Sequence, residues 1–273
     1  MSTASQRRDG RGPREMRGKE LRTSELTQFD GSAWYSQGLT TVVVAVNGPV
    51  AARQDDYRRC GVQVYVSRAA RLPRAGGAEQ LCVEEQRVEQ RRADAAVEAF
   101  LAASLEAVVR LEQFPRCVLE AHVTVLADDG ALLSVAANAL MCALLDAGVP
   151  CRTTVAAVSI AACAAEGPEQ TTGAAAAEAS AAPLLLLLDP TRVEEEGDGV
   201  RTRATATFLL SSSADGGDGC GGGVLASQLR ACPRSAAYGG GVSSKELAGM
   251  IALAERAAGS LFAFFRNCNV PLE

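Results

Sequence analysis

The chain contains a single histidine, His122, and its nine cysteines include no C-x-x-C pair. Zinc sites and histidine-rich metal centres need several such ligands at close spacing, so the composition argues against a metal site. His122 lies in a run, 119–126, that is typical of a β-strand, and we expect a structural role for it. No G-x-S-x-G elbow and no phosphate-binding loop is present, which argues against a serine hydrolase and a nucleotide-binding enzyme. We expect no cofactor.

Long hydrophobic runs are also missing from the sequence. The longest strongly apolar tract, Leu184–Leu188, is far shorter than the ~20 residues that cross a bilayer. No apolar segment follows the basic start of the chain, and no two cysteines are spaced as C-x-x-C. We therefore expect a soluble, intracellular protein from a reducing compartment.

Positive charge is scarce over most of the chain. The formal net charge is −5, from 27 Lys+Arg and 32 Asp+Glu, and only two residues are lysines. This balance argues against a protein whose entire surface binds nucleic acid. The exception is the segment 1–22, which holds seven basic residues against three acidic ones. Any contact with RNA or DNA must therefore be local.

The length and the apolar content are sufficient for a self-supporting core. The chain has 273 residues, of which 48% are hydrophobic and 22% charged, as in a soluble globular domain. We expect a basic N-terminal segment over 1–30 and a single domain over 31–273. The low-complexity stretch 164–182 and the glycine-rich stretch 214–223 are expected to be exposed loop insertions.

Hydrophobic periodicity predicts a mixed α/β (α+β) fold in which helices cover sheets. Long helices are expected over 78–111 and 134–145 and at the end of the chain, where Ser243 and Glu246 form a capping box. The helix over 134–145 is apolar on all sides except for Asn138, so it must be buried. Strands are expected at 39–46, 60–67, 117–126, 153–162, 184–188, 203–211 and 224–230.

Four segments, in this order, resemble the ribonuclease PH family and, within it, the RNase PH-like ring subunits of the eukaryotic RNA exosome. The first is R-D-G-R-x-P-x-E-x-R over 8–17. The second combines D-G-S-A at 30–33 with G-x-T-x-V at 38–42 and G-P at 48–49. The third is D-G at 129–130, N-A at 138–139 and A-L-x-D-A-G-V-P at 143–150. The fourth is L-L-D-P-T at 187–191.

This resemblance implies an RNase PH-like fold of two β-α-β-α-like halves with mixed sheets covered by helices. It also implies assembly with other RNase PH-like exosome subunits into a hexameric ring that carries cap subunits and passes single-stranded RNA through a central channel. Such a protein would contribute to RNA processing and degradation, including rRNA processing, in the nucleus, the nucleolus and the cytoplasm.

Active members of the family attack RNA from its 3′ end with inorganic phosphate, which requires cations around the phosphate. Their loop before the buried helix reads G-T-R or similar, where this chain has Ala131, Leu132 and Leu133. Alignment of the long helix places Ala99 and Ala103 where active members carry arginines. We therefore expect that the phosphate site is lost.

A carboxylate pair is retained at the spacing that family members show, as Asp189 and Glu195. Because Asp189 precedes Pro-Thr in a turn, we interpret the pair as vestigial and structural, although residual metal binding or hydrolysis stays open. Arg68, Arg71 and Arg74, in the loop before the long helix, are the candidates for weak contact with RNA phosphates. Arg11 and Arg14 are expected to form structural ion pairs.

The sequence therefore predicts a non-catalytic ring subunit that holds its neighbours and shapes the RNA channel. Two alternatives stay open at this point. One is an active phosphate-dependent 3′-to-5′ exoribonuclease, and the other is a free-standing nucleic-acid-binding dimer.

Overall fold

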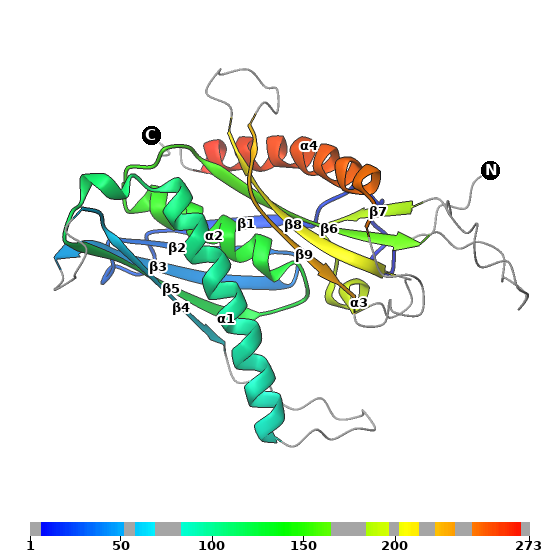
Figure 1. The fold of residues 1–273 in the computed structure, drawn as a ribbon, viewed down its shortest axis with the longest axis horizontal. Helices are drawn as coiled ribbons and strands as arrows, with labels where there is room; N and C mark the ends of the chain where they lie inside the picture. Colours follow the sequence, from blue (N-terminus) through cyan, green and yellow to red (C-terminus); the bar gives the residue numbers. More distant parts are fainter. Residues whose placement is uncertain are drawn as a thin grey trace, which may run out of the picture.

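The computed structural model describes residues 7–51, 58–68, 83–164, 184–196, 202–212, 222–232 and 242–268. These residues form two β-sheets joined by one continuous hydrophobic core. Figure 1 shows the sheets side by side, with α2 in the middle of the molecule and α4 over one of them.

The first sheet has five strands in the order β1-β2-β3-β5-β4. All neighbours are antiparallel except β4 and β5, which are parallel and are connected through α1 and the short helix η1. The alternation of Val42, Val44 and Val46 toward the interior fixes the register, because a slip by one residue would turn these side chains outward. The strands are β1 (Lys19–Thr23), β2 (Gly31–Gln37), β3 (Thr40–Ala51), β4 (Gly61–Arg68) and β5 (Cys117–Ala127).

The second sheet has four antiparallel strands in the order β7-β6-β8-β9. Its central strands are built from small and aliphatic residues that are buried on both faces, as expected of strands with a helix on each side. The strands are β6 (Val155–Ala164), β7 (Leu184–Leu188), β8 (Thr202–Ser211) and β9 (Val224–Ala231).

Helix α2 is the centre of the molecule, because it packs against β2 and β3 of the first sheet and against β6 of the second. Its position explains why nearly all of its residues are buried. Asn138, the polar exception, accepts a hydrogen bond from the backbone N–H of Ala157 at 2.7 Å and donates one to the Ala157 carbonyl at 3.0 Å. The helices are α1 (Val83–Val108), η1 (Leu111–Gln113), α2 (Leu132–Asp146), α3 (Arg192–Glu195) and α4 (Ser244–Cys268).

Helix α4 is long and apolar enough to cross a membrane by length and composition alone. In the fold it lies on β6 and β8, where Met250, Leu261 and Phe265 are buried against the sheet. It is therefore a core helix. The predicted capping box at its start is confirmed: the Glu246 N–H donates to Ser243 Oγ at 3.3 Å, and the Ser243 N–H donates to Glu246 Oε2 at 2.7 Å.

The seven predicted strands and the predicted helices are confirmed. Where the structure describes their ends, the observed and predicted ends differ by a few residues. The start of the long helix and most of the stretches 164–182 and 214–223 lie outside the described residues. Two strands were missed: β1, which lies within the segment 1–30, and β2, which lies at the start of the expected 31–273 domain. Residues 19–23 pair with 33–37 in the sheet.

His122 lies on β5 and stacks against Tyr65 of the neighbouring strand, with ring centroids 5.2 Å apart. Phe29 approaches it from a loop at 5.9 Å. The histidine therefore packs within an aromatic cluster on the face of the first sheet that faces away from α2.

Candidate functional site

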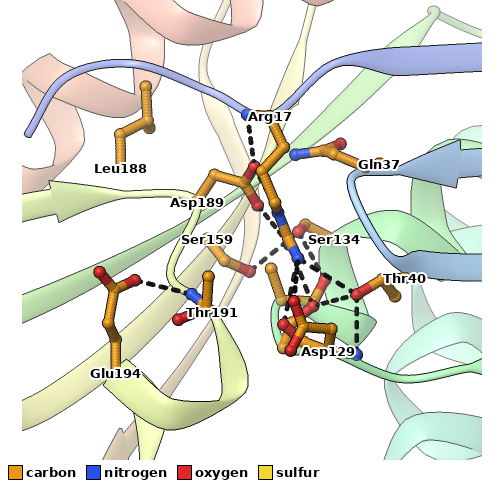
Figure 2. Close-up of polar contacts among 12 residues, drawn as sticks. Arg17, Gln37, Thr40, Asp129, Ser134, Ser159, Leu188, Asp189, Thr191 and Glu194 are labelled. Atoms are coloured by element: carbon orange, nitrogen blue, oxygen red, sulfur yellow. Dashed lines mark hydrogen bonds and ion pairs between the residues drawn. The ribbon is translucent and has the colours of Figure 1, made fainter. Parts of the chain in front are cut away.

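Arg17 is buried at the junction of the two sheets. Its Nε donates to Asp189 Oδ2 at 2.9 Å and its Nη2 to Asp189 Oδ1 at 2.7 Å. The same guanidinium donates to the backbone carbonyls of Asp129 and Gly130, each at 3.1 Å. Thr40 completes the group by donating to the Gly130 carbonyl at 2.8 Å. We refer to Arg17, Thr40, Asp129, Gly130 and Asp189 as the Arg17 cluster (Figure 2).

The Arg17 cluster draws on all four sequence segments that carry the family resemblance, with two members, Asp129 and Gly130, from the third. Gly130 allows the segments to meet, because a Cβ at this position would lie 2.4 Å from the backbone nitrogen of Arg192. Its φ of +93° also favours glycine. The four segments that carry the family resemblance therefore meet at one place in the structure.

A second buried ion pair lies next to this cluster. Arg7 Nε donates to Glu194 Oε1 at 2.8 Å, and Nη2 donates to Glu194 Oε2 at 2.6 Å. Arg7 also donates to the backbone carbonyls of Leu188 and Asp189, at 2.8 and 2.9 Å. Both arginines come from the first 17 residues and fasten the N-terminal segment onto the second half of the chain.

The electrostatics agree with a structural role for these pairs. Burial alone would raise the pKa of Asp189, but the hydrogen-bonded Arg17 guanidinium outweighs burial and holds the pKa below its usual value. The pKa of Glu194 is lowered against burial in the same way by Arg7. Both carboxylates are therefore ionised at neutral pH, and each is held by a buried arginine.

A cleft of about 780 Å³ opens beside the Arg17 cluster, between α1, the start of α2, α3 and β9. Leu132 and Leu133, at the N-terminus of α2, form one wall. Ser159 and Thr207 lie on the wall formed by the second sheet, with their hydroxyls 2.8 Å apart. Asp189 does not line the cleft, whereas Glu195 does. The two carboxylates at the family spacing therefore lie in different surroundings.

Glu195 occupies the N-terminal end of α2. Its Oε1 accepts a hydrogen bond from the Ala131 N–H at 2.9 Å. Such a helix end attracts anions through its free N–H groups and its dipole. Burial raises the pKa of Glu195 to about 7. The chain's own carboxyl group therefore lies where a helix N-terminus would otherwise receive an external anion.

The charges around the cleft balance among the described residues. Its arginines are Arg68, Arg92, Arg192 and Arg230, and its carboxylates are Glu89, Asp128, Glu195 and Glu196.

Two of these arginines are already paired. Arg68 donates to Asp128 at 2.8 Å and also pairs with Asp94, and Arg192 donates to Glu196 at 2.7 Å. Arg92 and Arg230 form no ion pair with any described residue.

The predicted positions on the long helix lie away from the cleft. Ala99 and Ala103 are exposed and do not line it, whereas Arg92, Ala93 and Ala96 of the same helix do. The long helix therefore brings one guanidinium, that of Arg92, to the cleft. Leu132 and Leu133 line the cleft at the N-terminus of α2.

The remaining candidate residues have mixed outcomes. The guanidinium of Arg68 is taken by Asp94 and Asp128, while Arg71 and Arg74 lie outside the described residues. Arg11 forms the expected ion pair, with Asp9. Arg14 is exposed and pairs with no carboxylate in the part of the chain that the structure describes.

The Arg17–Asp189 pair escaped the sequence analysis because its members are 172 residues apart. Two features of the sequence could have suggested the pair. The N-terminal motif is basic, and Asp189 directly follows an apolar strand.

Comparison with known proteins places this fold and site in a family. Residues 15–150 match domain 1 of the 3′ exoribonuclease family, RNase PH. The described fold resembles the crystal structure of rice Rrp46, with a TM-score of 0.68, 21% identity and coverage of 94% of this chain and 97% of that one. The chain therefore belongs to the ribonuclease PH family, as the four sequence segments predicted, and the RNase PH-like fold is confirmed.

Among named relatives, the mouse exosome complex component MTR3 is 30% identical over 209 residues, covering 68% of this chain and 64% of the relative. The Arabidopsis exosome complex exonuclease RRP46 homolog is 28% identical over 193 residues, covering 70% and 66%. The chain thus matches slightly less than two thirds of the length of these relatives.

Proposed function

We propose that this protein is a non-catalytic structural subunit of an exosome-type ring of RNase PH-like proteins. In this role it holds neighbouring subunits, shapes the RNA channel and supports 3′-to-5′ RNA processing by nucleases elsewhere in the assembly. The proposal draws on the family membership and on the relatives, which are named as exosome components. It includes residence in the nucleus, the nucleolus and the cytoplasm.

The observation that carries the proposed lack of catalysis is the position of Glu195. Phosphorolysis needs a phosphate ion beside the RNA backbone, and both are anions. Here the N-terminus of α2 is occupied by a carboxyl group and flanked by Leu132 and Leu133. A phosphate entering this end of the cleft would displace Glu195 without finding a cation on the helix. Asp189, the other family carboxylate, is committed to Arg17.

The second candidate is an active phosphate-dependent exoribonuclease, and one specific observation favours it. Arg92 and Arg230 line the cleft without ion pairs to described residues, so they are available to an anion. Glu195, with its pKa near 7, is a chemically reasonable proton donor beside them. Under this alternative, the cleft would bind the end of an RNA chain and phosphate together.

One assay separates the two candidates. The purified full chain is incubated with 5′-labelled single-stranded RNA, with and without inorganic phosphate and Mg²⁺. The proposal expects no shortening of the RNA under any condition. A matched variant that carries both Arg92→Ala and Arg230→Ala should give the same result as the wild-type chain. Phosphate-dependent release of nucleoside diphosphates that is lost in this variant would overturn the proposed lack of catalysis.

Ring membership is tested independently of catalysis. The full chain is mixed with purified RNase PH-like subunits of the same organism, and the product is weighed by native mass spectrometry. We expect one copy of the chain in a six-membered ring. A chain that stays monomeric, or forms only its own dimer, contradicts the structural role.

A further inference from the structure

Two of the nine cysteines lie opposite each other at one end of the first sheet. β4 and β5 are parallel, and their register pairs Gly61 with Val118. One residue earlier on each side, the same register brings Cys60 next to Cys117. Neighbouring strands lie about 4.8 Å apart, which is within the range of Cα–Cα distances that a disulfide bridges.

The side chains of Cys60 and Cys117 point to the same face of the sheet. Because side chains alternate between the two faces along a strand, Cys60 shares its face with Val62, and Cys117 shares its face with Leu119. All four side chains belong to the hydrophobic core or pack against it. Burial and, to a smaller extent, the nearby Cys117 thiol raise the pKa of Cys60. The two thiols are therefore close enough to affect each other.

No other two of the seven described cysteines lie opposite each other on neighbouring strands. Cys151 lies opposite Val109, and Cys163 lies opposite Leu185 and Thr202. The described cysteines that lie outside the strands are Cys142, Cys232 and Cys268. Cys82 and Cys220 lie outside the described residues.

The two thiols differ in their access to solvent. Cys60 is 3% exposed, whereas Cys117 is half-buried. An oxidant in solution therefore reaches Cys117 first, and the raised pKa of Cys60 also makes that thiol the less reactive of the two toward an oxidant. An accessible cysteine beside a second one that can react with its oxidised form is the usual arrangement of a redox-sensing site.

We propose that Cys60 and Cys117 form a redox-active pair, which hydrogen peroxide converts into an intramolecular disulfide. The Cys117 sulfur attacks one peroxide oxygen: an S–O bond forms, the O–O bond breaks, and the other oxygen leaves as water with the thiol proton. The Cys60 sulfur then attacks the Cys117 sulfur: the S–S bond forms, the S–O bond breaks, and a second water leaves with the Cys60 proton. The two thiols lose two electrons, which the peroxide gains.

The disulfide encloses the segment that contains α1 and η1, because both elements lie between Cys60 and Cys117 in the sequence. Helix α1 supplies Arg92, Ala93 and Ala96 to the cleft. A covalent bond at the ends of this segment reduces the number of its unfolded states. The pair therefore couples the stability of one cleft wall to the surrounding redox conditions. In a reducing compartment such a disulfide is transient, as is typical of redox sensors.

The test treats the folded full chain with hydrogen peroxide, removes the peroxide with catalase and blocks the remaining thiols with N-ethylmaleimide before denaturation. Digestion with trypsin and a glutamate-specific protease releases Cys60 in the peptide 60–68 and Cys117 in the peptide 117–120, each without another cysteine. We expect mass spectrometry to find these two peptides joined, with the mass of the pair lower by two hydrogen atoms. Dithiothreitol should separate them again.

Matched variants show which thiols are needed. Cys60→Ala and Cys117→Ala should each abolish the joined peptides. Cys151→Ala, which removes another half-buried cysteine that lies opposite a valine, should leave them at the wild-type amount. The oxidised wild-type chain should also unfold at a urea concentration about 1 M higher than the reduced chain, and Cys117→Ala should lose this shift.

Three results would overturn the proposal. The first is a wild-type chain in which peroxide leaves both thiols unchanged or carries Cys117 on to a sulfinic or sulfonic acid without joining it to Cys60. The second is a disulfide between other cysteines, such as Cys142 and Cys268, which also interact electrostatically. The third is a disulfide between two copies of the chain. Should the alanine variants fail to fold, the peptide map of the wild-type chain still decides.

Discussion

Asp189 and Arg17 form a two-pronged ion pair, with Nε–Oδ2 and Nη2–Oδ1 distances of 2.9 and 2.7 Å, in the interior of the protein. The pair turns an aspartate with the family's catalytic spacing into a structural anchor. Because the Arg17 N–H also donates to Asp189 Oδ2 at 2.9 Å, the carboxylate fixes the path of the N-terminal segment as well as its side chain.

Breaking this pair should destabilise the fold strongly. Arg17→Ala leaves the buried Asp189 carboxylate with only its longer ion pair to Arg11, at 3.6 Å, and we expect a loss of about 3–5 kcal/mol in the free energy of unfolding. The measurement is urea denaturation followed by circular dichroism. Arg14→Ala, which removes an exposed arginine from the same segment, serves as the control and should leave the midpoint unchanged. A loss for Arg17→Ala no larger than for the control would contradict the structural role.

Glu195 should give the protein a pH-dependent stability. Its pKa in the folded state is about 7, above the ordinary value of 4.5, so the folded chain binds more protons than the unfolded chain between these values. The contribution is therefore fully present below about pH 4.5 and is lost as the pH rises through 7. The Glu195→Gln variant should not show this loss and should be more stable than the wild type by about 3 kcal/mol at pH 8.

The check is urea denaturation of both proteins at pH 5 and pH 8. Only the difference between them matters, because the other carboxylates titrate equally in both. If the difference in unfolding free energy is the same at the two pH values, Glu195 is not the group responsible.

Asn138 should be essential for joining α2 to β6. Replacement by alanine leaves the N–H and C=O of Ala157 without the partners they have at 2.7 and 3.0 Å, which should cost about 2–3 kcal/mol. Thermal unfolding measures the loss, and Asn267→Ala, at an exposed position near the end of α4, is the control. Equal melting temperatures for the two variants would show that water replaces the side chain in the core.

The cap of α4 should have a small, separable effect. Ser243→Ala removes the acceptor for the Glu246 N–H and should lower the unfolding free energy by about 1 kcal/mol. Ser244→Ala, one residue further into the helix, removes the same hydroxyl group without removing the cap. A difference between these neighbours in urea denaturation isolates the capping hydrogen bond, and identical stabilities would argue against it.

Local patterns in the sequence were sufficient for most of the fold. The continuous β-branched run in β3, the apolar helix around Asn138 and the Ser243–Glu246 cap each depend on neighbours within a few residues, so the local sequence predicts them. β1 and β2 escaped because charged and small residues dominate them, and pairing in the sheet overrides their weak propensity.

The site was harder to predict because its geometry depends on long-range packing. The turn after β7 drew attention to Asp189, but its partner Arg17 lies 172 residues away in the sequence. The position of Glu195 at the N-terminus of α2 cannot be inferred from its spacing to Asp189. The same limitation applies to Arg92, because which residues of the long helix face the cleft depends on the elements packed against it.

The pairing of Arg7 with Glu194 spans 187 residues, and this separation has a consequence for synthesis of the protein. Glu194, the buried partner of Arg7, is added to the chain only 187 residues later. Pairing of the two residues must therefore be a late event in folding. A nascent chain that stalls before Glu194 would leave the Arg7 guanidinium without its buried carboxylate.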